Sequence, residues 1–183
     1  MIHMTKLSGV DDGVYHTHKI VKSLFPGTGR VLFFNSYGRV RVISECPPVG
    51  DTAYDGNSYV ASKVELASPA NGETVPFKVL FNPTKNVKQG GGKKSRCEGI
   101  IDQEAAKAWL ARELSKGGAK VLVSSVDPMG VTKFEKDGKG SVTVAQHFAV
   151  GALMVEDAEA FCKLLLSGIG GAKFAGYGMV DVW

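Results

Sequence analysis

The sequence has few cysteines and no long apolar run. Its three cysteines are Cys46, Cys97 and Cys162, and their spacing fits neither a paired disulfide framework nor a zinc site. No stretch approaches the roughly 20 apolar residues that cross a bilayer, and the first residues lack the apolar core of a signal peptide. We therefore expect a cytoplasmic protein with reduced thiols, no membrane attachment and no bound metal.

Sequence signatures of nucleotide-binding and serine-dependent enzymes are missing too. The chain has no Gly-Lys-Ser/Thr P-loop, no dinucleotide fingerprint after a first strand and no serine nucleophile motif, so we expect no cofactor. Its net charge is +4, and charged residues make up 22% of its length. This mild basic excess permits an anionic partner without requiring one.

A glycine-rich run near the C-terminus is the most distinctive segment that the chain does have. Five glycines and one lysine lie between Gly168 and Gly178. Glycine lets the backbone turn sharply, and the exposed N–H groups of such turns bind anions. We interpret the run as a phosphate-binding loop that uses Gly168, Gly170, Lys173, Gly176 and Gly178. A turn packed tightly on a sheet would explain the same composition.

The hydrophobic pattern predicts an α+β protein made of two tandem ferredoxin-like (βαββαβ) units. In the second half, strands and helices follow this order, with helices expected from Asp102 to Leu114 and from Glu156 to Leu166. The first half shows the same order, with a helix from Val14 to Leu24 and a hairpin over 30–45, although its second helix is weakly marked. A cluster of turn residues over 68–72 places the boundary between units 1–70 and 71–183.

The helix expected over 14–24 carries the candidate catalytic residues. Tyr15, His18 and Lys22 are three and four positions apart, so they form a stripe beside the buried one. His16 and Lys19 are expected to point the other way. An imidazole is the commonest proton shuttle at neutral pH, although a histidine on an amphipathic helix is structural more often than catalytic. A further histidine, His147, is expected on a sheet surface.

Basic residues gather in two segments that are predicted to be connections, over 83–99 and 127–140. The first carries Lys85, Lys88, Lys93, Lys94 and Arg96, and the second carries Lys133, Lys136 and Lys139. Clustered lysines in loops suit the electrostatic recognition of a phosphate backbone. A loop that charge merely keeps solvated would have the same composition.

Three blocks of the sequence resemble the CasE family of CRISPR RNA-processing endoribonucleases, within the RAMP superfamily. The first is Tyr15-His16-Thr17-His18 with Phe25-Pro26. That family has a tyrosine three residues before its active-site histidine and a Phe-Pro pair that begins seven residues after it, so His18 fits and His16 does not. The other two blocks are Phe81-Asn82-Pro83-Thr84-Lys85 with Ala108-Trp109-Leu110, and Gly151-Ala152-Leu153-Met154-Val155 with the glycine-rich run.

The resemblance implies an endoribonuclease that cuts the repeat hairpin of precursor CRISPR RNA without a metal. His18 would transfer the proton, Tyr15 would position the RNA and Lys22 would stabilise charge at phosphorus. The expected partners are the repeat RNA and the other subunits of the type I-E Cascade complex, with a monomer when the protein is isolated. Two alternatives stay open: an RNA-binding subunit that does not cut, and a nucleotide-binding enzyme that uses the glycine-rich run.

Overall fold

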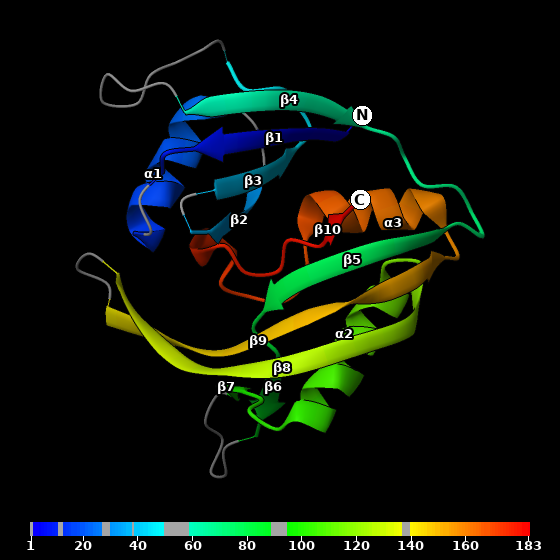
Figure 1. The fold of residues 1–183 in the computed structure, drawn as a ribbon. Helices are drawn as coiled ribbons and strands as arrows, with labels where there is room; N and C mark the ends of the chain where they lie inside the picture. The colour runs from blue at the N-terminus through cyan, green and yellow to red at the C-terminus, as the bar shows by residue number, and fades with distance from the viewer. Residues whose placement is uncertain are drawn as a thin grey trace.

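Two four-stranded antiparallel sheets face each other across the middle of the molecule (Figure 1). The computed structural model describes residues 2–10, 13–26, 30–37, 39–49, 59–88, 95–136 and 140–183. Each half of the chain contributes one sheet. Of the α-helices in these ranges, one lies between the two sheets, and the other two lie on the outer sides of the sheets. The α+β class and the tandem ferredoxin-like architecture are confirmed.

The first sheet has the strand order β2-β3-β1-β4. Its strands are β1 (Ile2–Ser8), β2 (Leu32–Ser36), β3 (Arg39–Ser44) and β4 (Val60–Leu66). Helix α1 (Val14–Leu24) packs on one face through Thr17, Ile20, Val21 and Leu24, the residues that a 3.6-residue period places together. The weakly marked second helix was expected over residues that lie largely outside the described ranges.

The second sheet has the order β10-β5-β9-β8. Its strands are β5 (Thr74–Phe81), β8 (Ala119–Lys136), β9 (Gly140–Val155) and β10 (Asp181–Val182). Helix α2 (Gln103–Lys116) covers one face, where the rings of Trp109 and Phe81 stack with centroids 5.8 Å apart. This helix begins after Asp102, whose carboxylate accepts a hydrogen bond from the Ala105 N–H at 2.8 Å, as its sequence predicted.

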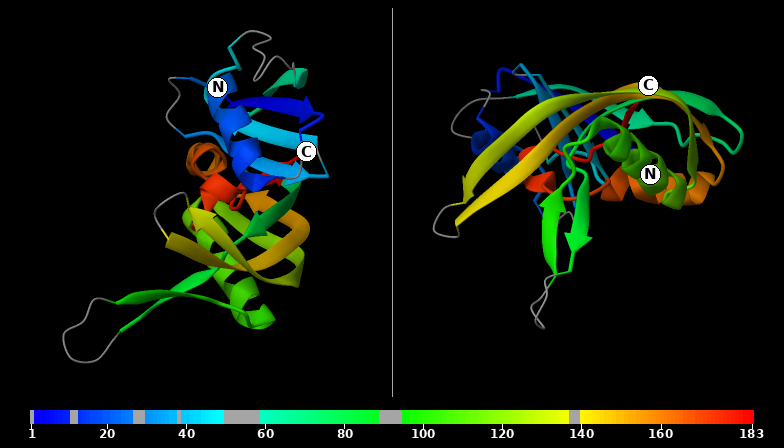
Figure 2. Two further views of the ribbon diagram at one scale, coloured as in Figure 1. Left: turned by 90° about the vertical axis from the view of Figure 1, so that its left-hand side faces the viewer. Right: turned by 90° about the horizontal axis from the view of Figure 1, so that it is seen from below.

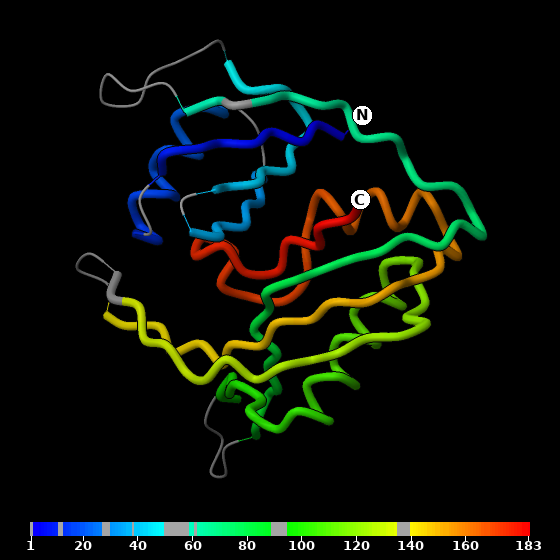
Figure 3. Tube along the Cα trace, viewed as in Figure 1, coloured from blue at the N-terminus to red at the C-terminus, as the bar shows by residue number. Residues whose placement is uncertain are grey.

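The C-terminal part of the chain joins the two sheets. Helix α3 (Ala158–Ser167) and the segment after it run between them (Figure 3). Leu32 and Ile43 of the first sheet belong to the same buried cluster as Leu165 of α3 and Val180. The boundary expected near residue 70 falls in the connection from β4 to β5, and it stays a prediction.

Both basic segments that were predicted as connections contain strands instead. Residues 84–87 and 96–99 pair as β6 (Thr84–Val87) and β7 (Arg96–Gly99), which form a separate antiparallel arm (Figure 2). Strand β8 continues to Lys136 and pairs with β9 from Gly140 onward, which makes one long ribbon. The lysines and glycines of these segments give no strand pattern in the sequence. The strands form because their backbones pair with strands further along the chain.

The prediction for His147 is wrong. Its side chain is only 1% exposed, its ring lies 5.6 Å from that of Phe81, and its Nε2 lies 3.2 Å from the carbonyl oxygen of Ile101. Strand alternation gave the correct face, but α2 covers that face. His147 is therefore part of the core.

A buried carboxylate links the two sheets. Asp181 of β10 is 1% exposed, and its Oδ2 lies 2.9 Å from Nη1 of Arg41 on β3 and 3.5 Å from Nζ of Lys78 on β5. Burial raises the pKa of Asp181, and the attraction of Arg41 and Lys78 opposes that rise. The ion pairs therefore offset only part of the desolvation of the carboxylate, and the pair with Arg41 connects the second sheet to the first.

Asp181→Asn should destabilise the protein. It leaves the two cations without their shared counter-charge, but it also removes the desolvation cost that raises the pKa of Asp181. We therefore expect a loss of about 1 kcal/mol, well below the cost of breaking a fully buried pair. Chemical unfolding of the two proteins measures the difference. The exposed Asp127, on β8, is the matched control: Asp127→Asn should change stability by less than about 0.5 kcal/mol. Equal effects of the two substitutions would contradict a linking role for Asp181.

Candidate functional site

Helix α1 is held at a defined position on the first sheet. The Nδ2 of Asn35 donates a hydrogen bond to Oγ1 of the buried Thr17 at 3.0 Å, and Phe33 of β2 belongs to the buried cluster under the helix. A second element also packs against α1: η1, a single 3-10 turn over Lys173–Ala175. The predicted catalytic helix and the glycine-rich run are therefore neighbours.

His18 is half-buried at the edge of this contact. Its ring centroid lies 6.4 Å from that of Phe33, with the planes tilted by 43°. Burial lowers the pKa of His18 and the positive charge of Lys22 lowers it further, because both disfavour the imidazolium form. The ring is thus held in its neutral form at neutral pH, which suits a proton acceptor.

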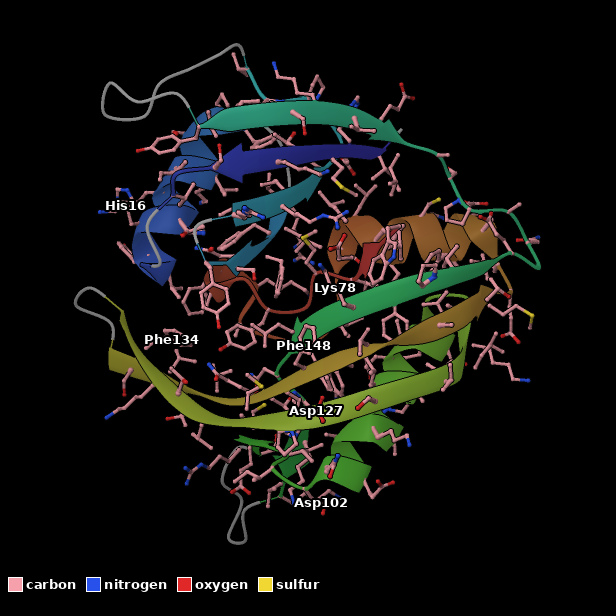
Figure 4. The ribbon with its side chains drawn as sticks, viewed as in Figure 1. His16, Lys78, Asp102, Asp127, Phe134 and Phe148 are labelled. Carbon is pink, nitrogen blue, oxygen red and sulfur yellow. The ribbon has the colours of Figure 1, made fainter. Side chains whose placement is uncertain are left out.

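Of the predicted stripe, the structure brings His18 and Lys22 together and gives Tyr15 another neighbour. Lys22 is exposed one helical turn after His18. The Nζ of Lys19 lies 4.8 Å from the ring centroid of Tyr15, so these two side chains share a face, contrary to expectation. Tyr15 itself is 45% exposed, and a ligand can reach its ring. His16 points outward from α1 (Figure 4).

The glycine-rich run is shaped by close packing. A Cβ on Gly178 would lie 2.0 Å from the carbonyl oxygen of Ile169, and one on Gly176 would lie 3.1 Å from the Phe33 ring, with φ at 84°. The N–H groups of Gly168, Gly176 and Gly178 already donate to backbone carbonyls of the chain. These contacts favour the alternative reading of the run as a tight turn, and leave the binding of phosphate by its glycines an untested prediction.

Lys173 lies at the edge of a cavity of about 440 Å³ between α2, α3 and the glycine-rich run. Burial and the nearby Arg30 lower its pKa, and Glu113 partly opposes them. Lys116 and Lys163 line the same cavity. The predicted backbone-binding lysine thus shares its surroundings with other cations.

The far part of the β8–β9 ribbon reaches η1 and the start of α1. The ring of Phe134 meets those of Phe174 and Tyr177 edge to face, at 6.3 and 6.1 Å. This cluster also contacts Val14 at the start of α1, and Gln146 hydrogen-bonds the Tyr177 hydroxyl. Lys133 is exposed on the opposite face of the ribbon from Phe134. Nothing is described of the side chain of Lys136, and Lys139 lies outside the described residues.

The β6–β7 arm is far from this region. Figure 2 shows it projecting from the body of the protein, on the side of the second sheet that α2 covers. Lys85, Lys88 and Arg96 are exposed on it, while Lys93 and Lys94 lie outside the described ranges. Its base is fixed by Asn82, whose Oδ1 accepts a hydrogen bond from the Ala145 N–H at 3.1 Å.

Sequence reasoning missed the residues that support His18. Phe33 and Asn35 were assigned only to a strand, and neither carries a motif. Alternation along β2 would have placed both on one face, but the sequence does not say which helix covers that face. Gly176 lies against Phe33, which packs under α1. These residues are far apart in the chain, so no local pattern connects them.

Several solved structures share the whole architecture. Cas6e from Escherichia coli K-12 is 24% identical, with a TM-score of 0.75 over 98% of both chains. Thermus thermophilus Cse3, bound to an RNA that represents a pre-cleavage complex, is 21% identical, with a TM-score of 0.80 over 100% of this chain and 98% of that one. A chain of E. coli Cascade bound to a PAM-containing dsDNA target is 18% identical, with a TM-score of 0.61 over 98% and 96%. At these identities the likeness establishes the fold.

The fold and the exposed basic elements define a tandem ferredoxin-like protein with a histidine-bearing helix. The chain belongs to the family described as CRISPR associated protein, whose family model matches residues 3–182. The resemblance seen in the sequence is thereby confirmed. No curated protein sequence matches the chain significantly.

None of the helices in the described ranges is long and apolar enough to span a membrane. No three histidine, cysteine or acidic side chains within these ranges are grouped so as to hold a metal ion.

Removing the charge of Lys22 should raise the pKa of His18. Lys22→Gln abolishes the smaller of its two causes and leaves burial in place, so the pKa stays below that of an unfolded chain. An NMR titration of the imidazole measures it. Lys19→Gln is the matched control and should leave the midpoint unchanged, because Lys19 lies over Tyr15 instead.

The lowered pKa also links His18 to stability. The folded state binds fewer protons than the unfolded state, so the contribution of His18 to stability is lost as the pH falls through the ordinary histidine range and below. His18→Gln should reduce this acid sensitivity. A His18 midpoint at or above that of an unfolded chain would contradict the described environment.

Gly176→Ala should disturb α1 through Phe33, and Gly72→Ala provides a matched control. Both glycines have φ near 80°, but a Cβ on Gly72 meets nothing within 4 Å. Each substitution should cost about 1–2 kcal/mol for the left-handed backbone, and Gly176→Ala about 1 kcal/mol more for the contact with the Phe33 ring. Urea unfolding measures both. Equal losses would show that Phe33 yields freely to the added methyl group.

Proposed function

We propose that this protein is a metal-independent endoribonuclease that cuts the repeat hairpin of precursor CRISPR RNA. The observation that carries the proposal is the half-buried, neutral imidazole of His18 beside the Lys22 ammonium, on a helix that is braced by Phe33 and η1. Membership of the CRISPR-associated family and the fold shared with an RNA-bound Cse3 support RNA as the substrate.

The proposed reaction is an internal transesterification. The 2′-hydroxyl next to the scissile phosphate attacks phosphorus, a new P–O2′ bond forms and the P–O5′ bond breaks. His18 accepts the proton of the 2′-hydroxyl, and a proton must reach the departing 5′-oxygen. The products are a 2′,3′-cyclic phosphate, which can open to a 3′ phosphate, and a 5′-hydroxyl.

Positive charge is needed where the phosphorane develops. The exposed Lys22 ammonium is one helical turn from His18 and supplies it, since a cation aimed at developing charge lowers the barrier. Tyr15 lies at the exposed start of the same helix, where its ring and hydroxyl can position the RNA. The Lys19 ammonium over its ring adds a second cation at this end.

The hairpin would be gripped by the basic elements outside the catalytic helix. Lys85 and Arg96 on the strands of the arm, Lys88 directly after β6 and Lys133 on the ribbon are exposed. We include Lys93, Lys94, Lys136, Lys139 and Lys173 with them. Duplex RNA is recognised mainly by shape and backbone contacts. Solved structures of E. coli Cascade that contain this fold support assembly with Cascade subunits.

A non-catalytic RNA-binding subunit is the second candidate. The Lys19 ammonium lies over the Tyr15 ring, so this ring already has a cation neighbour that the predicted catalytic stripe did not include. The two candidates differ in one property, which is whether bound RNA is cut at a single site.

His18→Ala should lower single-turnover cleavage of labelled repeat hairpin by about 10²–10⁴-fold, because a positioned proton-transfer group is lost. Assays in EDTA test metal independence, and mapping of the ends should find a 5′-hydroxyl on the downstream product. Binding of the hairpin should be retained. His16→Ala, two residues away and pointing outward, is the matched control and should cut normally.

Two outcomes would count against the proposal. Tight binding of the hairpin without any cut would favour the RNA-binding subunit. Equal rate losses in the two histidine variants would remove His18 from the chemistry and leave it a packing residue.

A further inference from the structure

A groove between the two sheets is lined by four cations, of which only two pair with the buried carboxylate of Asp181. It has a volume of about 460 Å³ and is lined by Lys6 on β1, Arg39 and Arg41 on β3, and Lys78 on β5, with Phe34 of β2 on its wall. We call this the inter-sheet groove, and Lys78 marks it in Figure 4. Asp181 beneath it pairs only with Arg41 and Lys78 within 4.0 Å in the described part of the chain.

The cations are placed where they repel each other. Lys6 and Arg41 are direct cross-strand partners in the β1–β3 ladder. Arg39 lies two residues before Arg41 on β3, and therefore on the same face of the sheet. Like charges directly opposite one another in a sheet are destabilising. In the described residues no carboxylate lies within 4.0 Å of the charged group of Lys6 or Arg39, although Lys6 is close enough to Asp181 to be attracted by it, and both cations are exposed. An anion that binds in the groove would account for this arrangement.

Aromatic rings lie beside the cations. The ring of Phe34, on the wall of the groove, stacks on that of Phe148 with centroids 6.5 Å apart. The Nζ of Lys78 lies 5.7 Å from the Phe34 centroid and 5.5 Å from that of Trp183, and Trp183 is 58% exposed. Cations combined with exposed aromatic rings form the surfaces on which single-stranded nucleic acid lays its phosphates and stacks its bases.

The groove is close to the candidate catalytic helix. Phe33 of β2 faces α1 and contacts His18, whereas the next residue, Phe34, faces the groove. One strand therefore separates the two sites, and the exposed end of β2 at Ser36 lines the groove. A strand of RNA that leaves the neighbourhood of His18 can pass around this end and enter.

We propose that the inter-sheet groove binds a single-stranded segment of RNA that flanks the hairpin. The proposal rests on the proposed function, because it takes the RNA to be cut near His18. A single strand offers phosphates and unstacked bases together, whereas a duplex hides its bases. The volume of the groove also suits a short segment rather than a helix, since it falls in the range of ordinary ligand pockets.

The test compares the affinities of three repeat RNAs: the bare hairpin, the hairpin with its 5′ flank and the hairpin with its 3′ flank. Each carries 2′-deoxyribose at the attacking nucleotide, which prevents cleavage. One flank should tighten binding to the wild-type protein. The double variant Lys6→Ala/Arg39→Ala should lose this gain, on the order of tenfold, with a salt dependence about 1.4 units shallower. Its affinity for the bare hairpin should not change.

A matched control removes two cations elsewhere. Lys107 and Arg112 are exposed on α2, on the far side of the second sheet, and Lys107→Ala/Arg112→Ala should keep the flank effect. Folding is checked by thermal unfolding. Because the groove variant relieves the repulsion of Arg41 by Lys6 but loses the attraction of Lys6 for Asp181, its Tm should stay close to that of the wild type.

The failures of the two proposals are distinguishable. If the hairpin is bound and cut but neither flank tightens binding, the groove proposal is overturned and the nuclease stands. If the groove variant loses affinity equally for bare and flanked RNA, its two cations contribute only general electrostatic attraction, and the groove proposal is overturned. An unchanged flank effect in the groove variant, with loss of binding to an acidic segment of a protein partner, would make the groove a protein-docking surface instead.

Discussion

The buried carboxylate of Asp181 is the interaction on which the arrangement of this protein depends. It lies between Arg41 of the first sheet and Lys78 of the second, at 2.9 and 3.5 Å. A buried charge is costly unless it is paired, so separating the sheets would deprive Asp181 of its closest partner, Arg41. The same movement would open the apolar cluster that Leu32 and Ile43 share with Leu165 and Val180. The glycine-rich segment leads into β10, and its single turn η1 lies against α1.

The candidate catalytic helix is supported mainly by contacts from distant segments. Phe33 lies under His18, Gly176 lies against Phe33, and the rings of Phe134 and Tyr177 pack beside η1. The small size and left-handed backbone of Gly176 allow this close approach. The glycines that suggested a phosphate-binding loop therefore have a structural explanation of their own. Their contribution to the site is the placement of the imidazole in a partly dehydrated environment, which favours its neutral form.

Positive charge is distributed over three separate surfaces, and each has a different structural basis. The β6–β7 arm presents cations far from the body, the ribbon presents Lys133 on the face that Phe134 does not share, and the inter-sheet groove collects cations above a single carboxylate. Holding like charges side by side lowers stability. A polyanion that contacts all three surfaces would compensate for that cost. A repeat RNA with a folded hairpin and unpaired flanks has both the length and the chemistry to do so.

Local pattern in the sequence determined α1 with its buried stripe, α2 between its Asp102 cap and Gly117, and the order of strands and helices in the second half. These features depend on side-chain periodicity and capping within a few residues, which a sequence displays directly. The tertiary structure decided the strands within the basic segments, the burial of His147, and the pairing of Arg41 with Asp181. Each of these depends on which distant backbone or helix covers a given face. No local pattern encodes that partner, because the contact forms only when the two sheets and α3 pack together.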